Sequence, residues 1–333
     1  MQTLFLVGPT AVGKSAVALA LARRLGAEIV SADSMQVYRG MDIGTAKPTL
    51  AERQTVPHHL LDVCDVSAGF DVKQYVESAR RSLAEIHHRG RGALVVGGTG
   101  LYVRALRHGL FEGPGRDADL RARLEQMTAA ALFEELQRVD SVTAARIDRQ
   151  NPRRLVRALE VWYTTGKPIA TWQTQWAAAT DHGSRTTDHG SPITASGPAF
   201  CLTRGRSDLH ARIERRIDAQ LAAGWVEEVR GLLARGLERN PTALQAAGYR
   251  ELAAHVRGHG SLAEATTRIK ARTRQLARRQ LTWFRREPEL IWIEMEEDEL
   301  TETTAGRIAQ ILSQSDDAGR SASAASQGTE PRR

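Results

Sequence analysis

One short segment near the N-terminus constrains the fold more than any other part of this 333-residue chain. Its eight residues fit the pattern G-x-x-x-x-G-K-[ST] and read Gly8-Pro9-Thr10-Ala11-Val12-Gly13-Lys14-Ser15. The apolar run Gln2 to Val7 precedes them, and the stretch Ala16 to Leu25, rich in helix-forming residues, follows. The pattern requires this order of strand, glycine loop and helix, so the segment predicts a phosphate-binding loop.

The chemistry of the loop suits two linked phosphates. Gly8 and Gly13 let the chain wrap with its N–H groups turned inward, the helix N-terminus adds about half a positive charge, and Lys14 adds a full one. Ser15 is placed to offer its hydroxyl to a Mg²⁺ ion bridging the phosphates. The pattern alone does not distinguish a leaving diphosphate from a γ-phosphate about to be transferred.

Two more apolar runs, Glu28 to Val30 and Ala93 to Val96, read as strands, and Val72 to His88 reads as a helix between them. Strands that alternate with helices predict a doubly wound parallel α/β sheet. Asp33 follows the second strand, at the sheet edge where such folds bind ligands, so it is expected to face the phosphate loop. Its carboxylate would act there as a base, as a helix N-cap or as a partner of hydrated Mg²⁺.

The remaining chain divides by composition. Five regions are expected: a first part of the core at 1–115, an all-helical insertion at 116–176, a low-complexity linker at 177–198, a second part of the core with basic helices at 199–312, and a disordered tail at 313–333. The linker contains Thr-Asp-His-Gly-Ser twice, among Ala, Thr and Gly, which provide too little apolar surface for packing.

Arginine gives the chain its net charge of +7, from 46 Lys and Arg against 39 Asp and Glu. The stretch Ser207 to Leu221 places Arg212 and Arg216 four residues apart on one helix face. A second helix, Leu262 to Phe284, carries six cations with no acid between them: Arg268, Lys270, Arg272, Arg274, Arg278 and Arg279. The helix is either a solvated cationic face or a surface that meets a polyanion such as RNA.

Other features exclude functions. No apolar run approaches the roughly 20 residues of a membrane helix, and no secretory signal is evident, which predicts a cytoplasmic protein. No sequence feature requires an oligomer, so a monomer is expected. Cys64 and Cys201 match no metal-ligand spacing and are expected to be reduced, partly buried thiols. His58 and His59 read as a partly buried, hydrogen-bonded pair, since no third ligand is evident.

Several segments together resemble the tRNA dimethylallyltransferase family, also called tRNA isopentenyltransferase, from Leu4 to Phe284. Besides the loop, the motifs that carry the resemblance are Asp33 to Pro48, Pro57-His58-His59-Leu60, Gly97 to Tyr102, Arg157-Ala158-Leu159-Glu160-Val161, Gly248-Tyr249-Arg250-Glu251, and Arg278 to Arg285. The chain departs from the family pattern at Leu276, where an aromatic residue is usual, and at Arg278, where Lys is usual.

The resemblance implies a P-loop, kinase-like core and a helical insertion that grips the anticodon stem-loop of tRNA. It implies transfer of a dimethylallyl group from dimethylallyl diphosphate to N6 of adenosine at tRNA position 37, next to the anticodon, with Mg²⁺ as cofactor. By similarity Asp33 is the general base, Thr10 touches the bridging oxygen of the diphosphate, and Arg216 faces that leaving group.

The same resemblance implies a set of residues that contact tRNA. They are Asp33, Ser34, Met35, Gln36, Thr99, Arg121, Arg153, Arg154, Leu155, Val156, Arg157, Gln245, Gly248, Tyr249, Arg250, Arg278, Arg279, Gln280, Trp283 and Arg285. Four aromatic residues are candidates for stacking on a flipped-out base or for the core: Tyr38, Tyr102, Tyr249 and Trp283.

Two other functions remain open at this stage. A P-loop small-molecule kinase would fill the loop with ATP and use Asp33 to deprotonate a hydroxyl. A nucleotide-gated RNA-binding switch would cycle nucleotide and leave RNA unmodified. RNA-dependent release of diphosphate from dimethylallyl diphosphate would separate both from a prenyltransferase.

Overall fold

The structure, a computed structural model, describes residues 2–109, 113–115, 117–172 and 195–326. The chain forms two compact units. The core unit comprises Met1–Arg107 and Ala195–Arg333, and the helical unit comprises His108–Thr194. Most of the expected linker, residues 177–194, lies outside the described residues.

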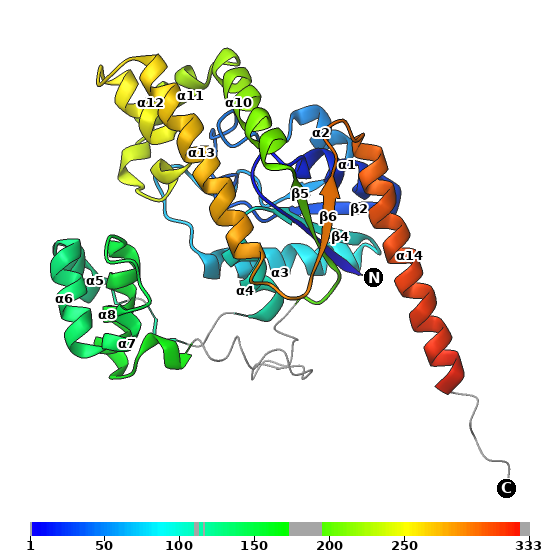
Figure 1. The fold of residues 1–333 in the computed structure, drawn as a ribbon, viewed down its shortest axis with the longest axis horizontal. Coiled ribbons are helices and arrows are strands. Elements are labelled where there is room, and N and C mark those ends of the chain that lie inside the picture. The colour runs from blue at the N-terminus through cyan, green and yellow to red at the C-terminus, as the bar shows by residue number, and fades with distance from the viewer. Residues whose placement is uncertain (1, 110–112, 116, 173–194, 327–333) are drawn as a thin grey trace, which may run out of the picture. The chain divides into compact units, whose positions relative to one another are not determined.

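A parallel sheet forms the centre of the core unit (Figure 1). Its strands are β1 Thr3–Val7, β2 Ala27–Ser31, β3 His58–His59, β4 Gly92–Gly97, β5 Ala199–Arg204 and β6 Leu290–Met295, in the order β3-β2-β4-β1-β5-β6. Every pair in the sheet is parallel. The predicted α/β fold with a parallel sheet is therefore confirmed.

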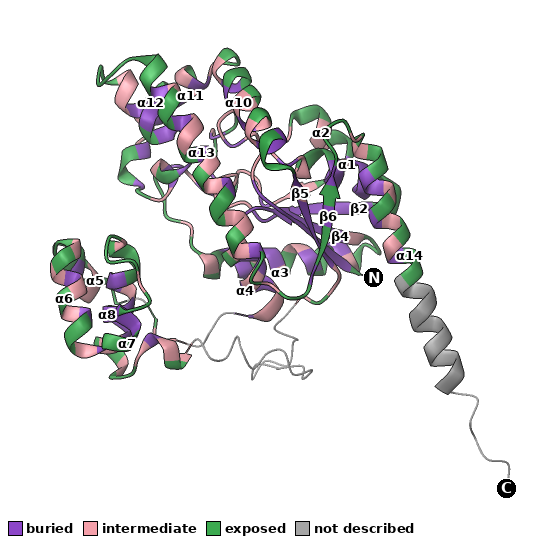
Figure 2. Ribbon diagram, viewed as in Figure 1, coloured by how far each residue is buried: buried purple, intermediate pink, exposed green. Residues whose placement is uncertain are grey.

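The strands of the sheet are nearly continuous apolar runs because helices cover both faces. All five residues of β1 and of β2 are buried, and Figure 2 shows the central strands in purple. Leu6 of β1 pairs in register with Val96 of β4 and Phe200 of β5. The loop that leaves β1 therefore lies between the ends of two neighbouring strands.

Eleven helical segments are described in the core unit. They are α1 Lys14–Leu25, α2 Leu50–Thr55, α3 Val72–His88, α4 Gly100–His108, α10 Arg206–Ala222, α11 Trp225–Ala234, α12 Tyr249–Val256, α13 Leu262–Phe284, α14 Thr301–Ser326, and the short 3₁₀ turns η2 Leu237–Arg239 and η3 Ala243–Gln245. Capping boxes begin two of the longest: Asp71 with Gln74 for α3, and Ser261 with Glu264 for α13. These two helices have the bounds that the sequence predicted.

The helical unit has its own apolar core. Its described helices are α5 Ala118–Glu125, α6 Ala129–Val139, α7 Ser141–Ala144 and α8 Pro152–Thr165, and each begins at a capping Asp, Thr or Asn. Leu132 and Leu136 of α6 pack with Leu155 and Leu159 of α8, and all four are fully buried. This amphipathic packing explains why the region has helical apolar spacing and no strand pattern.

The expectation of a disordered tail at 313–333 is wrong for its first part, because α14 extends to Ser326. Ile308 and Leu312 of α14 are buried in the core cluster that also contains residues of α1. Once this packed half has formed, each added residue costs little, and Ala-rich sequence propagates a helix well. Composition alone predicted disorder because it does not show that the preceding turns of α14 pack against the core.

The segment Ala199 to Thr203 also reads as a strand in the sequence, and the structure has it as β5. Two strands were absent from the prediction. β3, His58–His59, is only two residues long and contains no apolar run. β6 is apolar at five of its six positions, but only three of the six are buried, and Ile291 and Trp292 are exposed. Both are edge strands of the sheet.

Two simpler expectations are also answered. Cys64 and Cys201 are buried and unpaired, and burial raises the pKa of the Cys201 thiol to about 12. None of the helices within the described ranges is long and apolar enough to cross a membrane.

Candidate active site

The phosphate-binding loop has an unusual backbone path. Gly8 and Gly13 have φ angles of +146° and +112°, and Ala11 also has a positive φ, of +64°. A Cβ atom on Gly8 would lie 2.6 Å from the carbonyl oxygen of Leu202 in β5. α1 begins at Lys14, and no side chain caps its N-terminus. The N-terminal N–H groups of α1 are therefore left available to an anion, as the sequence pattern predicts.

Side chains from distant segments hold the loop. The Nε of Arg204 donates to the carbonyl of Val12 at 2.9 Å, and the Nε of Arg212 donates to that of Ala11 at 3.0 Å. Arg204 is buried and also pairs with Asp208 at 2.9 Å. Because C=O and N–H point in opposite directions in a trans peptide, fixing the Val12 carbonyl on Arg204 turns the N–H of Gly13 away from it.

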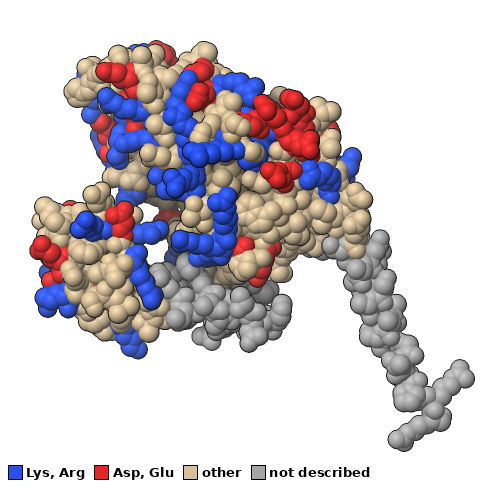
Figure 3. All heavy atoms as spheres, viewed as in Figure 1, with Lys and Arg blue, Asp and Glu red and all other residues tan. Residues whose placement is uncertain are grey.

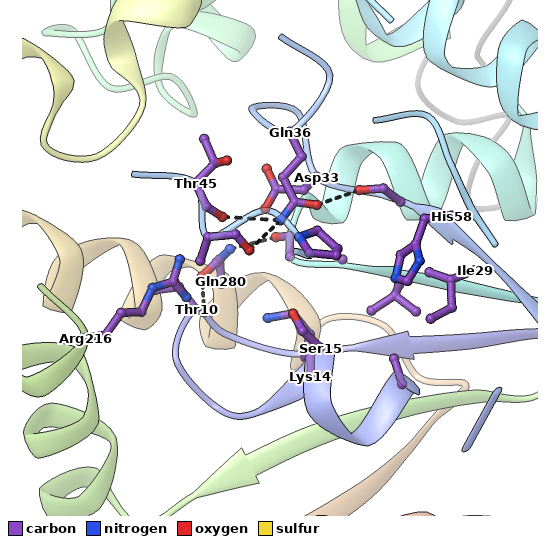
Figure 4. Close-up of a pocket in the computed structure, with 17 residues that line it drawn as sticks. Thr10, Lys14, Ser15, Ile29, Asp33, Gln36, Thr45, His58, Arg216 and Gln280 are labelled. Carbon is purple, nitrogen blue, oxygen red and sulfur yellow. Dashed lines mark hydrogen bonds between the residues drawn. The ribbon is translucent and has the colours of Figure 1, made fainter. Parts of the chain in front are cut away.

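A small pocket of about 70 Å³ opens beside the loop (Figure 4). It is lined by residues from four parts of the core unit: the loop and α1, the ends of β2 and β4, the segment from Thr45 to His58, and the helices α10 and α13. Thr10, Lys14, Ser15, Asp33 and Arg216 all line it. The structure thus brings together the residues to which the sequence assigned the chemistry.

Two cations face this pocket with no carboxylate in ion-pair distance among the described residues: Lys14 and Arg216. The Nζ of Lys14 donates to the carbonyls of Gly8 and Pro9 at 2.9 and 2.7 Å. Burial lowers the pKa of Lys14 to about 8, and nearby Asp33 opposes this. Burial also lowers the pKa of Arg216, again against Asp33. Such partly desolvated cations gain most from a bound anion.

Asp33 lies directly after β2, and Figure 4 shows it across the pocket from Lys14 and Ser15. One carboxylate oxygen accepts the N–H of Met35 at 2.9 Å, which orients the side chain; no described helix begins at Asp33, so it is not a helix N-cap. Its other oxygen has no hydrogen-bond partner among the described residues. The carboxylate therefore has a free acceptor site at the pocket.

A second, wider hollow of about 440 Å³ adjoins the outer side of the loop. Lys14, Ser15 and the arginines Arg212, Arg215 and Arg216 line it, with Ala11, Gly13 and Ala16. No group of three His, Cys, Asp or Glu that would hold a metal by itself exists in the described part of the chain. A magnesium ion here would instead need phosphate oxygens and the Ser15 hydroxyl, which donates to no described protein group.

Comparisons with known proteins agree with this geometry. A family model described as IPP transferase matches residues 36–287, most of the chain. The chain belongs to the IPP transferase family.

Relatives in this family cover most of the chain. A protein named tRNA dimethylallyltransferase from Geobacter metallireducens is 47% identical over 295 residues, covering 86% of this chain and 90% of its own. One of the same name from Syntrophobacter fumaroxidans is 44% identical, covering 95% and 89%. The crystal structure of a full-length tRNA isopentenylpyrophosphate transferase from Bacillus halodurans matches with a TM-score of 0.68 and 37% identity, covering 96% of this chain and 99% of that one. None of these supports the kinase or the nucleotide-gated switch.

Family membership directs attention to the basic surface. Figure 3 shows Lys and Arg side chains gathered on the face that carries α10 and α13. No acid lies between the six cations of α13 in the sequence, but three of them pair with acids of neighbouring helices. Lys270 pairs with Asp218 at 2.7 Å, Arg274 with Glu214 at 2.8 Å, and Arg272 with Glu251. α10 and α12 supply the acids that α13 lacks.

Arg268, Arg278 and Arg279 of α13 form no ion pair with any described residue. Arg279 lines a hollow of about 400 Å³ together with Gln245 and Arg250. Leu276 lines it too, at the position where the family usually has an aromatic residue. Three predicted tRNA contacts from η3, α12 and α13 therefore meet at one concave basic surface. Arg285, which ends α13, is exposed.

Several other predicted contacts are buried. Tyr249 and Leu155 are fully buried and Val156 nearly so, so their side chains do not reach a ligand on the surface. Gly248, at the start of α12, is packed against the ring of Trp225, which fills the space that its Cβ would need. The sequence placed these four among basic neighbours, but the amphipathic helices turn them toward the core.

The aromatic candidates also belong mainly to the core. Tyr38 and Tyr249 are fully buried, and Tyr102 stacks on Tyr75 with ring centroids 4.0 Å apart. Of the two alternatives, base stacking or the core, the structure supports the core for these three tyrosines. Trp283 is half-buried, and the guanidinium of Arg104 lies 4.8 Å from its ring centroid.

Two predicted contacts in the helical unit serve a buried carboxylate. Arg121 and Arg157 both pair with Glu160, which is fully buried. Burial alone would raise the pKa of Glu160, but these hydrogen bonds outweigh it and lower the pKa. Arg153 and Arg154 are exposed at the start of α8. These four arginines therefore divide into a structural pair and a surface pair.

Two polar residues and one apolar residue among the predicted tRNA contacts connect segments of the core unit. Gln280 accepts the N–H of Thr10 at 2.8 Å and donates to the carbonyl of Gly98 at 2.9 Å. The Oγ1 of Thr99 accepts the N–H of Ser34 at 3.0 Å. Met35 packs against the core cluster. Thr10, Gly98 and Gln280 line the pocket, so the contacts of Gln280 help to shape it.

His58 is one of the pocket residues that the sequence reasoning did not assign to the site. Its Nδ1 contacts the carbonyl of Val56 at 2.7 Å, and burial lowers its pKa. The Nε2 of His59 lies 2.7 Å from Glu28, which also pairs with Arg89. The interpretation as a hydrogen-bonded pair is confirmed, but only the fold shows that His58 reaches the pocket.

Proposed function

We propose that this chain transfers a dimethylallyl group from dimethylallyl diphosphate to N6 of adenosine at position 37 of tRNA. One observation carries the proposal: a single pocket joins two unpaired cations beside a phosphate-binding loop, Lys14 and Arg216, to a carboxylate with a free oxygen, Asp33. The names of the curated relatives support the same reaction class.

The donor binds on the loop side. As the bond between C1 and the bridging oxygen breaks, negative charge accumulates on the leaving diphosphate. Lys14, Arg216 and the N–H groups at the start of α1 stabilise that charge where it develops. Thr10 lines the same pocket and, by the family resemblance, would touch the bridging oxygen.

Magnesium fits the same side of the pocket. Ser15 lines both hollows beside the loop, and its hydroxyl is available as a ligand. When bound, Mg²⁺ would neutralise charge on the diphosphate oxygens.

The acceptor enters from the opposite side. The lone pair of the exocyclic amine is delocalised into the adenine ring, so the amine is a poor nucleophile. Asp33 accepts the N6 proton as the bond from nitrogen to the allylic carbon forms, which balances the departure of diphosphate. A base in an anticodon loop reaches this pocket only when flipped out, at a cost of about a few kcal/mol. The basic surface with Gln245, Arg250 and Arg279 would bind the RNA backbone.

The experiment is mass analysis of nucleosides from unmodified tRNA incubated with the protein, Mg²⁺ and dimethylallyl diphosphate. We expect N6-(dimethylallyl)adenosine and one diphosphate released for each modified nucleoside. A transcript with guanosine in place of adenosine 37 is the control and should stay unmodified. Transfer of label from γ-³²P ATP to an acceptor, with no isoprenoid on RNA, would contradict the proposal.

A further inference from the structure

The carboxylate of Glu228 in α11 is saturated with hydrogen bonds. One oxygen accepts the backbone N–H groups of Asp42 and Ile43 at 2.8 and 2.6 Å. The other accepts the N–H of Gly44 at 3.2 Å and the hydroxyl of Tyr249 at 2.7 Å. Three successive N–H groups that converge in this way form an anion-binding nest, and here the anion is a side chain of the same protein.

Two further residues of neighbouring helices hold the same loop, Met41–Lys47. The amide of Gln220 in α10 donates to the carbonyls of Ile43 and Gly44 at 2.6 and 3.1 Å. The indole ring of Trp225 packs so closely that a Cβ atom on Gly44 would lie 2.2 Å from its ring nitrogen. α10, α11 and α12 therefore fix the backbone position of this loop together.

The loop in turn forms a wall of the pocket. Thr45 and Ala46 line the pocket, and their carbonyls accept hydrogen bonds from the amide of Gln36 at 3.2 and 3.4 Å (Figure 4). The amide oxygen of Gln36 accepts the hydroxyl of Ser31 in β2 at 3.0 Å. A continuous series of contacts thus leads from Glu228 to the segment that carries Asp33.

No hydrogen bond of this series touches the phosphate-binding loop. The loop Gly8–Ser15 is held by Arg204, Arg212 and Gln280. Loss of the Glu228 contacts would therefore move the acceptor wall and leave the donor site in place.

We infer that Glu228 is a positioning residue for the acceptor nucleoside. It holds Thr45, Ala46 and Gln36 at the distance from Lys14 that a flipped-out base requires. The inference rests on the proposed transfer to tRNA. Displacement of a reacting group by about 1 Å costs on the order of 10²-fold in rate, so a small shift of this wall is measurable.

Glu228→Gln tests the inference because the amide keeps the size of the side chain but places an NH₂ group against N–H donors. We expect the single-turnover rate constant for transfer to tRNA to fall by about 10- to 100-fold. The affinity for dimethylallyl diphosphate should stay within twofold of the wild type. A rate constant reports only on folded molecules, so partial unfolding would lower the amplitude and leave the rate constant unchanged.

Glu227→Gln is the matched control. Glu227 precedes Glu228 in α11, is exposed, and pairs only with exposed Arg230 among the described residues. It loses the same charge without touching the loop, so both transfer and donor affinity should remain within twofold.

Tyr249→Phe decides the question if Glu228→Gln does not fold, because it removes one donor and retains the buried ring. We expect its transfer rate constant to fall at least threefold with donor affinity unchanged. An unchanged rate constant in the folded variants, or equal losses of transfer and donor affinity, would overturn the inference. A wild-type protein that modifies no RNA would instead overturn the proposed function.

Discussion

The two sides of the pocket are built in different ways. The donor side is a contiguous segment, Gly8–Ser15, whose backbone and helix N-terminus supply most of the anion site. The acceptor side combines the end of β2 with the loop Met41–Lys47, and side chains of α10, α11 and α12 hold that loop. A site made of local backbone geometry is encoded in a short motif, whereas a site made of long-range contacts requires the folded chain.

The largest expected effect comes from the acceptor side. Asp33→Ala should lower the single-turnover rate of transfer by about 10²- to 10⁴-fold, because general-base assistance is lost. Donor affinity should change little, since Lys14, Arg216 and the loop remain. Rapid-quench measurement with radiolabelled dimethylallyl diphosphate checks this. A rate within threefold of the wild type would contradict the role of Asp33.

A variant on the donor side tests whether the phosphate-binding loop depends on the hydrogen bond from Arg204. Arg204→Met removes the donor to the Val12 carbonyl and leaves the buried carboxylate of Asp208 unpaired. We expect the free energy of unfolding to fall by about 3–5 kcal/mol and donor affinity to fall about tenfold or more.

The double variant Arg204→Met with Asp208→Leu separates the two effects. It removes the unpaired charge and should recover most of the free energy of unfolding in urea titrations. Donor affinity, measured by isothermal titration calorimetry, should stay low because the Val12 carbonyl still lacks its donor. Recovery of both would show that Arg204 serves stability alone.

The pH dependence of donor capture tests the role of Lys14 on the donor side of the pocket. The pKa of Lys14 in the free protein is about 8 because of burial, below its ordinary value of 10.5. Lysine is cationic below its pKa, so the second-order rate constant kcat/KM for the donor should be level up to about pH 8. Above it, kcat/KM should decline by up to about tenfold per pH unit.

The same pKa shift affects protein stability in the opposite direction to kcat/KM. Between pH 8 and 10.5 the unfolded chain binds the Lys14 proton and the folded chain does not, so this group makes the protein more stable as pH rises. A level kcat/KM profile for the donor up to pH 9.5 would exclude a role for the charge of Lys14 in donor capture.

The smallest expected effect concerns RNA affinity. Arg279→Ala should weaken tRNA binding and reduce the slope of log K against log salt by about one, since Arg279 has no described acidic partner and faces the concave basic surface. Filter binding at several salt concentrations measures the slope. Lys270→Ala is the control, because Lys270 already pairs with Asp218 and should change the slope less. Equal changes of the salt slope in the two variants would show that the ion pairs of α13 open when tRNA binds.

Prediction from sequence succeeded where the determinants are local. The helices Val72–His88 and Leu262–Phe284 were predicted at their bounds, and the structure shows that a local capping box begins each of them. The edge strand Leu290–Met295 was missed although five of its six residues are apolar, because a short apolar run by itself does not distinguish a strand from a buried helix segment. The helical continuation to Ser326 was missed because it depends on packing of the preceding turns.

Prediction of the site followed the same division. Lys14, Asp33 and Arg216 were recognised from motifs, and they share one pocket. The roles of Leu155 and Tyr249 were misjudged because a motif reports which residues occur together and does not report which way a helix faces. Glu228 belongs to no motif that was recognised, since its four donors come from Asp42, Ile43, Gly44 and Tyr249, far away in the chain.

The sequence by itself determined the phosphate-binding loop, the parallel α/β class and the basic character of α13, because backbone conformation and apolar periodicity depend on neighbouring residues. Only the tertiary structure decided which cations stay unpaired, which aromatic residues are buried, and what holds the acceptor wall. Those properties depend on charges and surfaces that meet only after the chain has folded, when burial makes an unpaired polar group costly.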